Sequence, residues 1–137
     1  MSFVIYNVTD GQTTNMPRWP TRVTFKIQAD VKETRFPGAL PLLLAFGKKA
    51  NKLQIEGVIQ IAGVTKPTLV TSYLLPLETA VYKEVTITAS GMIWASAATS
   101  PARRYTFAGI TFEERPGITR AFFYTAEFWQ GSDIIQM

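Results

Sequence analysis

The 137-residue chain contains neither cysteine nor histidine. Without cysteine it has no disulfide bond, no thiolate metal site and no cysteine nucleophile. Without histidine it lacks a Ser-His-Asp triad, an imidazole general base and the common ligands of zinc. The ten carboxylates are scattered singly apart from Glu113 and Glu114, which would point to opposite faces of a strand. We therefore expect no catalytic residue, no metal and no cofactor, and we predict that the chain is not an enzyme.

Long hydrophobic runs are absent as well. The longest apolar run, residues 39–46, is interrupted by Pro41 and is far shorter than the roughly 18 residues of a membrane span. The N-terminal MSFVIYNVTDGQ has no basic stretch ahead of an apolar core, so we expect no signal peptide. These features predict a soluble protein that is not secreted through a signal peptide and has no contact with a membrane.

Alternation with a period of two dominates the rest of the chain. In TRVTFKIQADV, which begins at Thr21, apolar residues recur at every second position, as in a strand with one buried and one wet face. Six further segments read as strands, with a β-bulge expected at Gly109: residues 3–8, 52–61, 84–89, 92–95, 104–113 and 118–129. We therefore predict a single domain over residues 1–137, an all-β sandwich or barrel with one short α-helix.

The non-strand segments complete this prediction. Residues 71–82 have the spacing of a short helix, and Pro76 restricts where that helix begins. A turn is expected at Pro37-Gly38, followed by one or two helical turns over residues 40–46. Residues 1–20 form an N-terminal strand and an arm in which Trp19 lies between two prolines.

Lysines gather in the segment Phe36–Gln60, after the Pro-Gly turn and the apolar run. The G-K-K at 47–49 is not a phosphate loop, because the preceding glycine lies nine positions upstream and an alanine follows the lysines. A nucleic-acid site would need a basic groove with stacking rings, but basic residues elsewhere do not converge in the sequence. We interpret the cluster as a lysine-rich turn between a buried helix and a strand: Lys48, Lys49 and Lys52.

The segment ITRAFFYTAEFW, residues 118–129, carries large aromatic side chains on both faces of its predicted strand. A sugar-binding platform would load one face, whereas two apolar faces suggest a core on one side and a neighbouring subunit on the other. The first strand and the Trp19 arm are of the kind that adds to a neighbour's sheet. The candidate assembly interface is therefore Phe3, Ile5, Tyr6, Trp19, Phe123 and Trp129.

The order of the motifs resembles the β-sandwich module of tailed-phage tail and baseplate proteins. The motifs are FPGALP at 36–41, FGKKA at 46–50, LQIEGVI at 53–59, a helix-like 74–82, and a final pair of strands with YTF at 105–107 and FEE at 112–114. Distal tail proteins, baseplate hubs and the N-terminal modules of DNA-circularisation-type proteins share this pattern. The likeness covers residues 22–129.

The resemblance implies a non-enzymatic virion structural protein, a subunit of a phage tail or baseplate ring. Its partners would be further copies of itself and other tail proteins, and it would be located in the virion tail after synthesis in the host cytoplasm. Phe36–Gln60 would be scaffold, with residues 42–46 as a plug over one end of the sandwich. Lys48, Lys49 and Lys52 would form a basic lysine rim that faces a neighbouring subunit, the tail tube or the passing genome.

Two other classes stay open at this point. A carbohydrate- or receptor-binding module would expose rings on one concave face, with Trp129 or Trp94 beside polar groups such as Gln130, Asn51 or Asp133. A single-strand nucleic-acid binder of the five-stranded barrel type would lose affinity steeply as salt is added.

Overall fold

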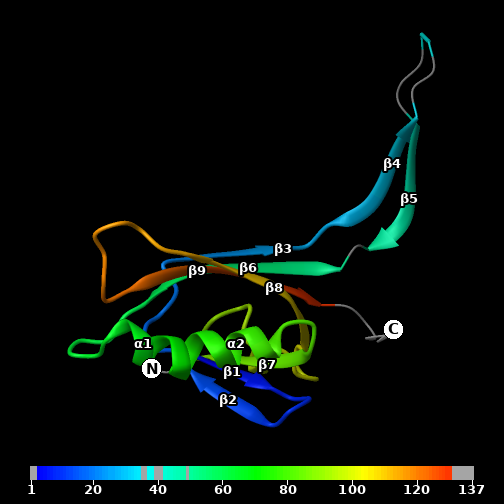
Figure 1. The fold of residues 1–137 in the computed structure, drawn as a ribbon. Helices are drawn as coiled ribbons and strands as arrows, with labels where there is room; N and C mark the ends of the chain where they lie inside the picture. Colours follow the sequence, from blue (N-terminus) through cyan, green and yellow to red (C-terminus); the bar gives the residue numbers. More distant parts are fainter. Residues whose placement is uncertain (1–2, 35–36, 39–41, 49, 131–137) are drawn as a thin grey trace.

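The computed structural model describes residues 3–34, 37–38, 42–48 and 50–130. Its main element is a seven-stranded antiparallel sheet, so the expectation of an all-β fold with one short helical segment is confirmed (Figure 1). In spatial order the strands are β2 (Gln12–Asn15), β1 (Phe3–Asn7), β7 (Glu84–Ala89), β8 (Tyr105–Glu113), β9 (Phe122–Gln130), β6 (Asn51–Ile59) and β3 (Arg22–Lys26).

The sheet is divided into two layers by a weak link between β7 and β8. These strands share two paired positions, Glu84 with Thr106 and Val85 with Tyr105, whereas β6 and β9 pair along nine. Figure 1 shows β3, β6, β9 and β8 as one layer above β7, β1 and β2. Every second residue of the long strands points between the layers and is buried, as the period of two requires. The core includes Leu53, Ile55, Ile87, Phe107 and Phe128.

One helical segment lies beside the two layers and contributes Leu69, Leu77 and Ala80 to the core. It consists of α1 (Lys66–Leu69), a π-helical stretch (Val70–Leu74) and α2 (Leu75–Ala80). The helix predicted for 71–82 is therefore present but begins at Lys66. Pro67 stands in the first turn, where its missing N–H costs nothing, and the π stretch precedes Pro76, whose ring would clash with a regular preceding turn.

The strand predicted for residues 92–95 is wrong. After β7 the chain turns at Gly91, whose φ of 80° is open to glycine, and continues through a loop into a short 3₁₀ helix (Ser96–Ala98). Backbone hydrogen bonds from Met92 N–H to the Ala89 carbonyl and from Ala95 N–H to the Met92 carbonyl curl the loop. The bulge expected at Gly109 is confirmed by a shift in register with β9 after Phe107.

The remaining two strands form a hairpin of their own, β4 (Ala29–Thr34) and β5 (Leu42–Lys48). The single strand expected over residues 21–31 therefore ends at Lys26, and the chain resumes in a second sheet. The helical plug expected at 40–46 is also wrong, because this run is a strand paired to β4, for example Leu44 with Lys32. The backbone N–H and C=O groups of this apolar run find hydrogen-bond partners in β4, the strand that precedes the turn. That turn at Pro37-Gly38 is confirmed, with Gly38 at a φ of 73°.

Candidate assembly surfaces

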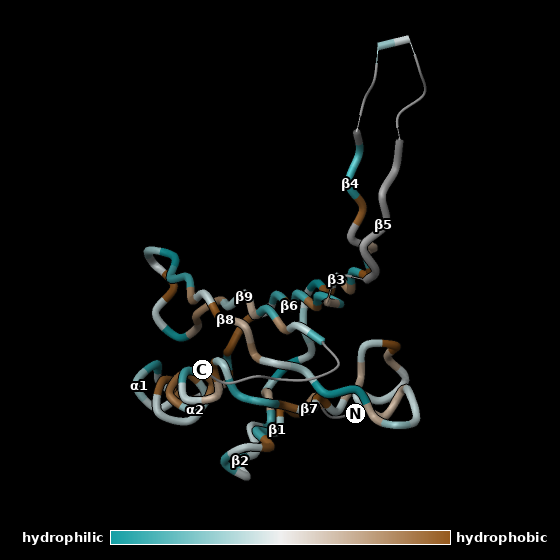
Figure 2. Tube along the Cα trace, turned by 90° about the vertical axis from the view of Figure 1, so that its right-hand side faces the viewer, coloured by the Kyte–Doolittle hydropathy of each residue, from teal (hydrophilic) through white to brown (hydrophobic). Residues whose placement is uncertain are grey.

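The β4–β5 hairpin stands away from the rest of the protein. Two perpendicular views show it rising from the end of the layer that contains β3 and β6 (Figures 1 and 2). Ile27, at its base, is 57% exposed, and Val31, on β4, is 47% exposed. The β5 sequence LLLAFGK carries no charge before Lys48. An isolated two-stranded hairpin is marginally stable in water, so this element has the properties of a segment that needs a partner.

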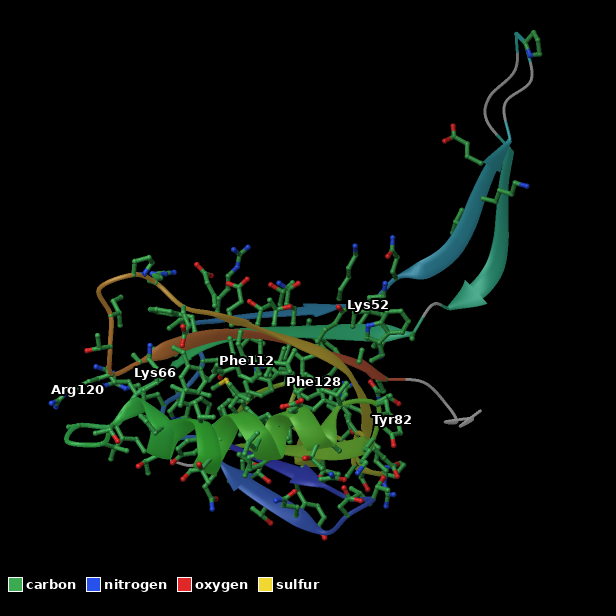
Figure 3. All side chains as sticks on the ribbon, viewed as in Figure 1. Lys52, Lys66, Tyr82, Phe112, Arg120 and Phe128 are labelled. Carbon is green, nitrogen blue, oxygen red and sulfur yellow. The ribbon has the colours of Figure 1, made fainter. Side chains whose placement is uncertain are left out.

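The outer face of the four-stranded layer is polar, with two aromatic residues. Figure 3 shows its side chains pointing away from the core. Trp129 is 41% exposed, and the Lys52 ammonium lies 4.5 Å from the centre of its ring. The indole N–H of Trp129 donates a hydrogen bond to Glu127 at 2.6 Å. Both contacts hold the Trp129 side chain in place on the surface, since a cation over an indole is attracted to it.

Phe123 lies on the same outer face and is half-buried. The Arg115 guanidinium stacks 3.9 Å from its ring centre and lies 3.6 Å from the Glu113 carboxylate. The neighbouring positions of β9, Phe122 and Tyr124, are buried in the core. The division of the aromatic strand into a core side and an outer side is therefore present, and the outer side carries Phe123 and Trp129.

The N-terminal residues proposed for an interface are mostly used within the chain itself. Phe3 and Ile5 are each 3% exposed, and β1 lies between β2 and β7, so that both of its edges are paired. Trp19 is half-buried, with its ring stacked 6.3 Å from that of Phe3. Tyr6 is exposed and lies on the outer side of β1. Of the six candidate residues, the structure thus leaves Tyr6, Phe123 and Trp129 accessible to a partner.

The lysine rim is divided between two elements. Lys52 lies on β6, and Lys48 is the last residue of β5, opposite Ala29, while Lys49 lies outside the described residues. The structure adds Lys26, which the sequence analysis missed, as the cross-strand neighbour of Lys52. Both lysines lie in segments whose alternation predicts strands, but the sequence did not show that these two strands pair, or in which register.

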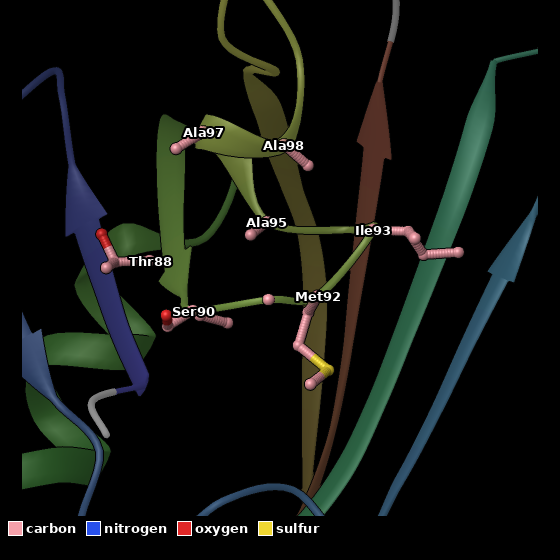
Figure 4. A pocket seen from close by; sticks show the side chains of 9 residues that line it. Thr88, Ser90, Met92, Ile93, Ala95, Ala97 and Ala98 are labelled. Atoms are coloured by element: carbon pink, nitrogen blue, oxygen red, sulfur yellow. The ribbon is translucent and has the colours of Figure 1, made fainter.

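A hollow of about 520 Å³ lies at the loop that follows β7, and the sequence analysis did not find it (Figure 4). Its nine lining residues fall between Thr88 and Ala98, and none is charged. Small side chains such as Ala97 and Ala98 leave the space open, and Ile93, 72% exposed, lies among them. The composition ASGMIWASAATS was the available signal, because a run of small residues leaves volume unfilled.

The loop around this hollow is held by three hydrogen bonds. The Ser96 hydroxyl accepts one from Ile87 N–H at 2.8 Å, and the Ser96 carbonyl accepts one from Arg103 N–H at 2.8 Å. The Tyr105 hydroxyl donates to the Trp94 carbonyl at 2.7 Å. These bonds hold Trp94 and Ser96, in the second half of the loop, against β7 and β8.

Chemistry of other kinds finds little support in the described part of the chain. No group of three or more acidic side chains is gathered there to hold a metal ion. Within the same residues, no helix has the length and apolarity to span a membrane. Burial raises the pKa of Tyr105 to about 12 against the opposing effect of Arg103, and burial also raises the pKa of Tyr124. Both phenols therefore stay neutral at physiological pH and serve the core.

Of the residues considered for a sugar platform, Asn51, Gln130 and Trp129 lie at neighbouring positions of β6 and β9, but Trp129 and Gln130 alternate to opposite faces of β9. Trp94 is buried, with its ring edge-on to Phe3, and the ring of Trp129 has Lys52 over it. Asn51 and Gln130 are hydrogen-bonded to each other at 3.0 Å, and Asp133 lies outside the described residues. These contacts do not favour a carbohydrate site.

No protein-family model matches the sequence, and no curated protein sequence matches it. Among solved structures, a chain of the sheath–tube complex of an extracellular contractile injection system (PVC) is similar, with 12% identity and a TM-score of 0.43, over 98% of this chain and 87% of that one. A chain of the PVC sheath/tube terminator has 13% identity and a TM-score of 0.41 over 98% and 93%. One from the baseplate of the anti-feeding prophage has 14% identity and a TM-score of 0.42 over 96% and 88%.

These neighbours come from extracellular contractile injection systems and from the anti-feeding prophage, and their TM-scores lie between 0.41 and 0.43. Their identities of 12–14% are too low to carry any residue's role over to this chain. Its function has to come from its own geometry.

Proposed function

We propose that this chain is a non-enzymatic structural subunit of a phage-tail-type assembly, forming a homo-oligomeric ring that also contacts other tail proteins. The observation that carries the proposal is the β4–β5 hairpin, an element with an apolar strand that stands apart from the chain's own core. Its place would be in the virion tail. Tyr6, Phe123 and Trp129 are the accessible aromatic residues that contribute to the interface.

The physical argument is that apolar side chains of the hairpin remain exposed to water in the monomer. Ordering a residue's backbone costs roughly 1–2 kcal/mol, and a hairpin repays this by burying apolar side chains. Val31 and Ile27 remain 47% and 57% exposed within the monomer, so much of their apolar surface is still in contact with water. Contact with another subunit supplies the missing burial, and charged residues on the outer sheet face, such as Arg22 and Lys26 on the edge strand β3, oppose indiscriminate edge-to-edge pairing.

The test removes the hairpin and keeps the sheet. Residues 28–50 are replaced by Asn-Gly, so that positions 27 and 51 flank a two-residue turn and continue the register in which Lys26 pairs with Lys52. We expect this variant to unfold cooperatively as a monomer, whereas the full chain grows in mass with concentration in light scattering. Assembly of the shortened chain equal to that of the full chain would contradict the proposal, as would a full chain that stays monomeric alone and with tail partners.

A matched pair of point variants gives the finer control. Val31→Ser on the hairpin and Leu75→Ser on α2 remove apolar side chains of nearly equal exposure, 47% and 48%. Val31→Ser is expected to weaken association, and Leu75→Ser to leave it as in the full chain. Equal effects would mean that general surface apolarity, and not the hairpin, drives association.

A further inference from the structure

We infer that the hollow formed by residues 88–98 receives the β4–β5 hairpin of a second copy of this chain. The inference rests on the proposed function, because it requires that copies assemble through the hairpin. It adds the surface to which the hairpin binds.

The two surfaces match in chemistry. The hollow is lined by small and apolar side chains, among them Met92, Ala97 and Ala98, and none of its lining residues carries a charge. An apolar occupant is therefore favoured, since a charged group placed there without a partner would lose its hydration. The hairpin supplies apolar residues through Val31 and the six uncharged residues that open β5, and the contact leaves the charged Lys32 and Glu33 of β4 outside it.

The hollow is also large enough to hold part of a hairpin. Its volume of about 520 Å³ falls in the range of roughly 300–1,000 Å³ that is usual for binding pockets. Figure 4 shows Met92 and Ile93 on the loop that lines the hollow, and these side chains are 37% and 72% exposed. Their exposure is explained if a second chain covers them.

The hairpin of the same chain does not fill this hollow. The hairpin rises from the layer of β3 and β6 and points away from β7, whose end begins the hollow (Figures 1 and 2). Contact between two different surfaces of identical chains is heterologous and closes into a ring when the rotation allows it. A hairpin-to-hollow contact therefore leads to the same type of assembly that the proposed function requires.

The hollow needs little rearrangement to bind. Ser96 joins the loop to β7 through its hydroxyl and to Arg103 through its carbonyl, and Tyr105 holds the Trp94 carbonyl. A site fixed in this way loses little conformational freedom on binding, which favours the complex.

The test uses the natural absence of cysteine. One batch of full chain carries Val31→Cys, a second carries Ala98→Cys, and the two are mixed under oxidising conditions. Both side chains are exposed, so neither change disturbs the core. We expect a disulfide-linked dimer of the two variants, and little of it when Ser72→Cys, exposed on the helical segment, replaces Ala98→Cys.

A second variant tests the hollow without cross-linking. Ala98→Arg places a charge in the apolar contact and is expected to weaken association by about tenfold or more, since burying an unpaired charge costs well over the roughly 1.4 kcal/mol of a tenfold change. Ser72→Arg is the matched control and should assemble as the parent does. Thermal unfolding of both variants checks that the monomer is intact.

The outcomes separate the two ideas. If assembly depends on the hairpin but tolerates Ala98→Arg, and Val31→Cys cross-links elsewhere, the hollow is not the receptor and the proposed function stands. If a different tail protein or an apolar small molecule occupies the hollow, Ala98→Arg leaves self-association unchanged, which also overturns the inference. If the parent chain is monomeric under every condition, both ideas fail.

Discussion

Tyr124 on β9 lies directly against Gly57 on β6, and a Cβ added at Gly57 would stand 2.7 Å from its phenolic oxygen and 2.9 Å from the ring carbon that bears it. The two residues are cross-strand partners, so the absence of a side chain at Gly57 gives the ring its place in the core. Gly57→Ala should therefore lower the free energy of unfolding by about 1–3 kcal/mol, the usual cost of overpacking. Denaturant unfolding measures this loss.

The control for that substitution is another strand glycine. A Cβ at Gly109 would meet no atom within 4 Å, and its φ is not in the left-handed region. Gly109→Ala should be neutral or should stabilise by about 0.4–1 kcal/mol, because alanine restricts the unfolded chain. If the two substitutions cost the same, the contact with Tyr124 does not restrict position 57.

The two buried phenols differ in their hydrogen bonds. The Tyr105 hydroxyl donates to the Trp94 carbonyl, whereas the Tyr124 hydroxyl is buried with no partner among the described residues. Tyr105→Phe should cost about 1–3 kcal/mol because it leaves a carbonyl unsatisfied, and Tyr124→Phe should be neutral or stabilising. Urea unfolding of the two variants tests the difference, and the reverse order would contradict the assignment of partners.

Stability should fall in alkaline solution through Tyr105. Burial, opposed by Arg103, raises the pKa of its phenol from 10.0 to about 12 in the folded chain. The folded state therefore holds the phenolic proton more tightly than the unfolded state, so the stabilisation is complete below pH 10 and is lost as the pH rises towards 12.

The measurement is the free energy of unfolding of the parent and of Tyr105→Phe between about pH 8 and pH 11. The difference between the two should be constant below about pH 9 and should shrink above about pH 10, near the ordinary pKa of tyrosine. A difference that stays constant to the top of this range would mean that folding does not raise the pKa of the Tyr105 phenol.

Much of the fold could be predicted because alternation directly reports which residues face a core. In the strand expected over residues 52–61, the alternating apolar residues Leu53, Ile55 and Ile59 are all fully buried. The turn at Gly38 followed from glycine's freedom to adopt a positive φ, and the bulge at Gly109 from the change of alternation at a glycine inside a strand, and both are local signals.

The rest depended on pairing between distant segments, which a single sequence does not report. The alternation from Thr21 to Val31 continues through the point after Lys26 where the chain changes sheet, so no local signal marked the change. The apolar run at 42–48 has the composition of a buried plug, and its pairing with β4 decides otherwise. The hollow was not predicted because it depends on how small side chains, such as Ala97 and Ala98, pack in three dimensions, and a single sequence does not report that packing.

The loop that forms the hollow should depend on one hydroxyl. Ser96 is buried and its Oγ accepts a hydrogen bond from Ile87 N–H at 2.8 Å. Ser96→Ala leaves that backbone donor unsatisfied and should cost about 1–3 kcal/mol, whereas Ser90→Ala, in the exposed part of the same loop, should stay within about 0.5 kcal/mol of the parent. Hydrogen exchange at Ile87 provides a residue-level readout, and unchanged protection in Ser96→Ala would contradict the bond.

Trp129 should report on assembly if the outer sheet face takes part in it. The chain has three tryptophans, and Trp129 is exposed while Trp94 is buried and Trp19 is half-buried. As the concentration rises and subunits associate, the emission of Trp129 should move to shorter wavelength and become less accessible to acrylamide, because a covered indole is shielded from water. Trp129→Phe should remove this change without preventing association, since Phe keeps most of the apolar surface. An increase in mass with no change in the parent's emission would exclude the outer face from the interface and leave the hairpin and the hollow as the contacts to pursue.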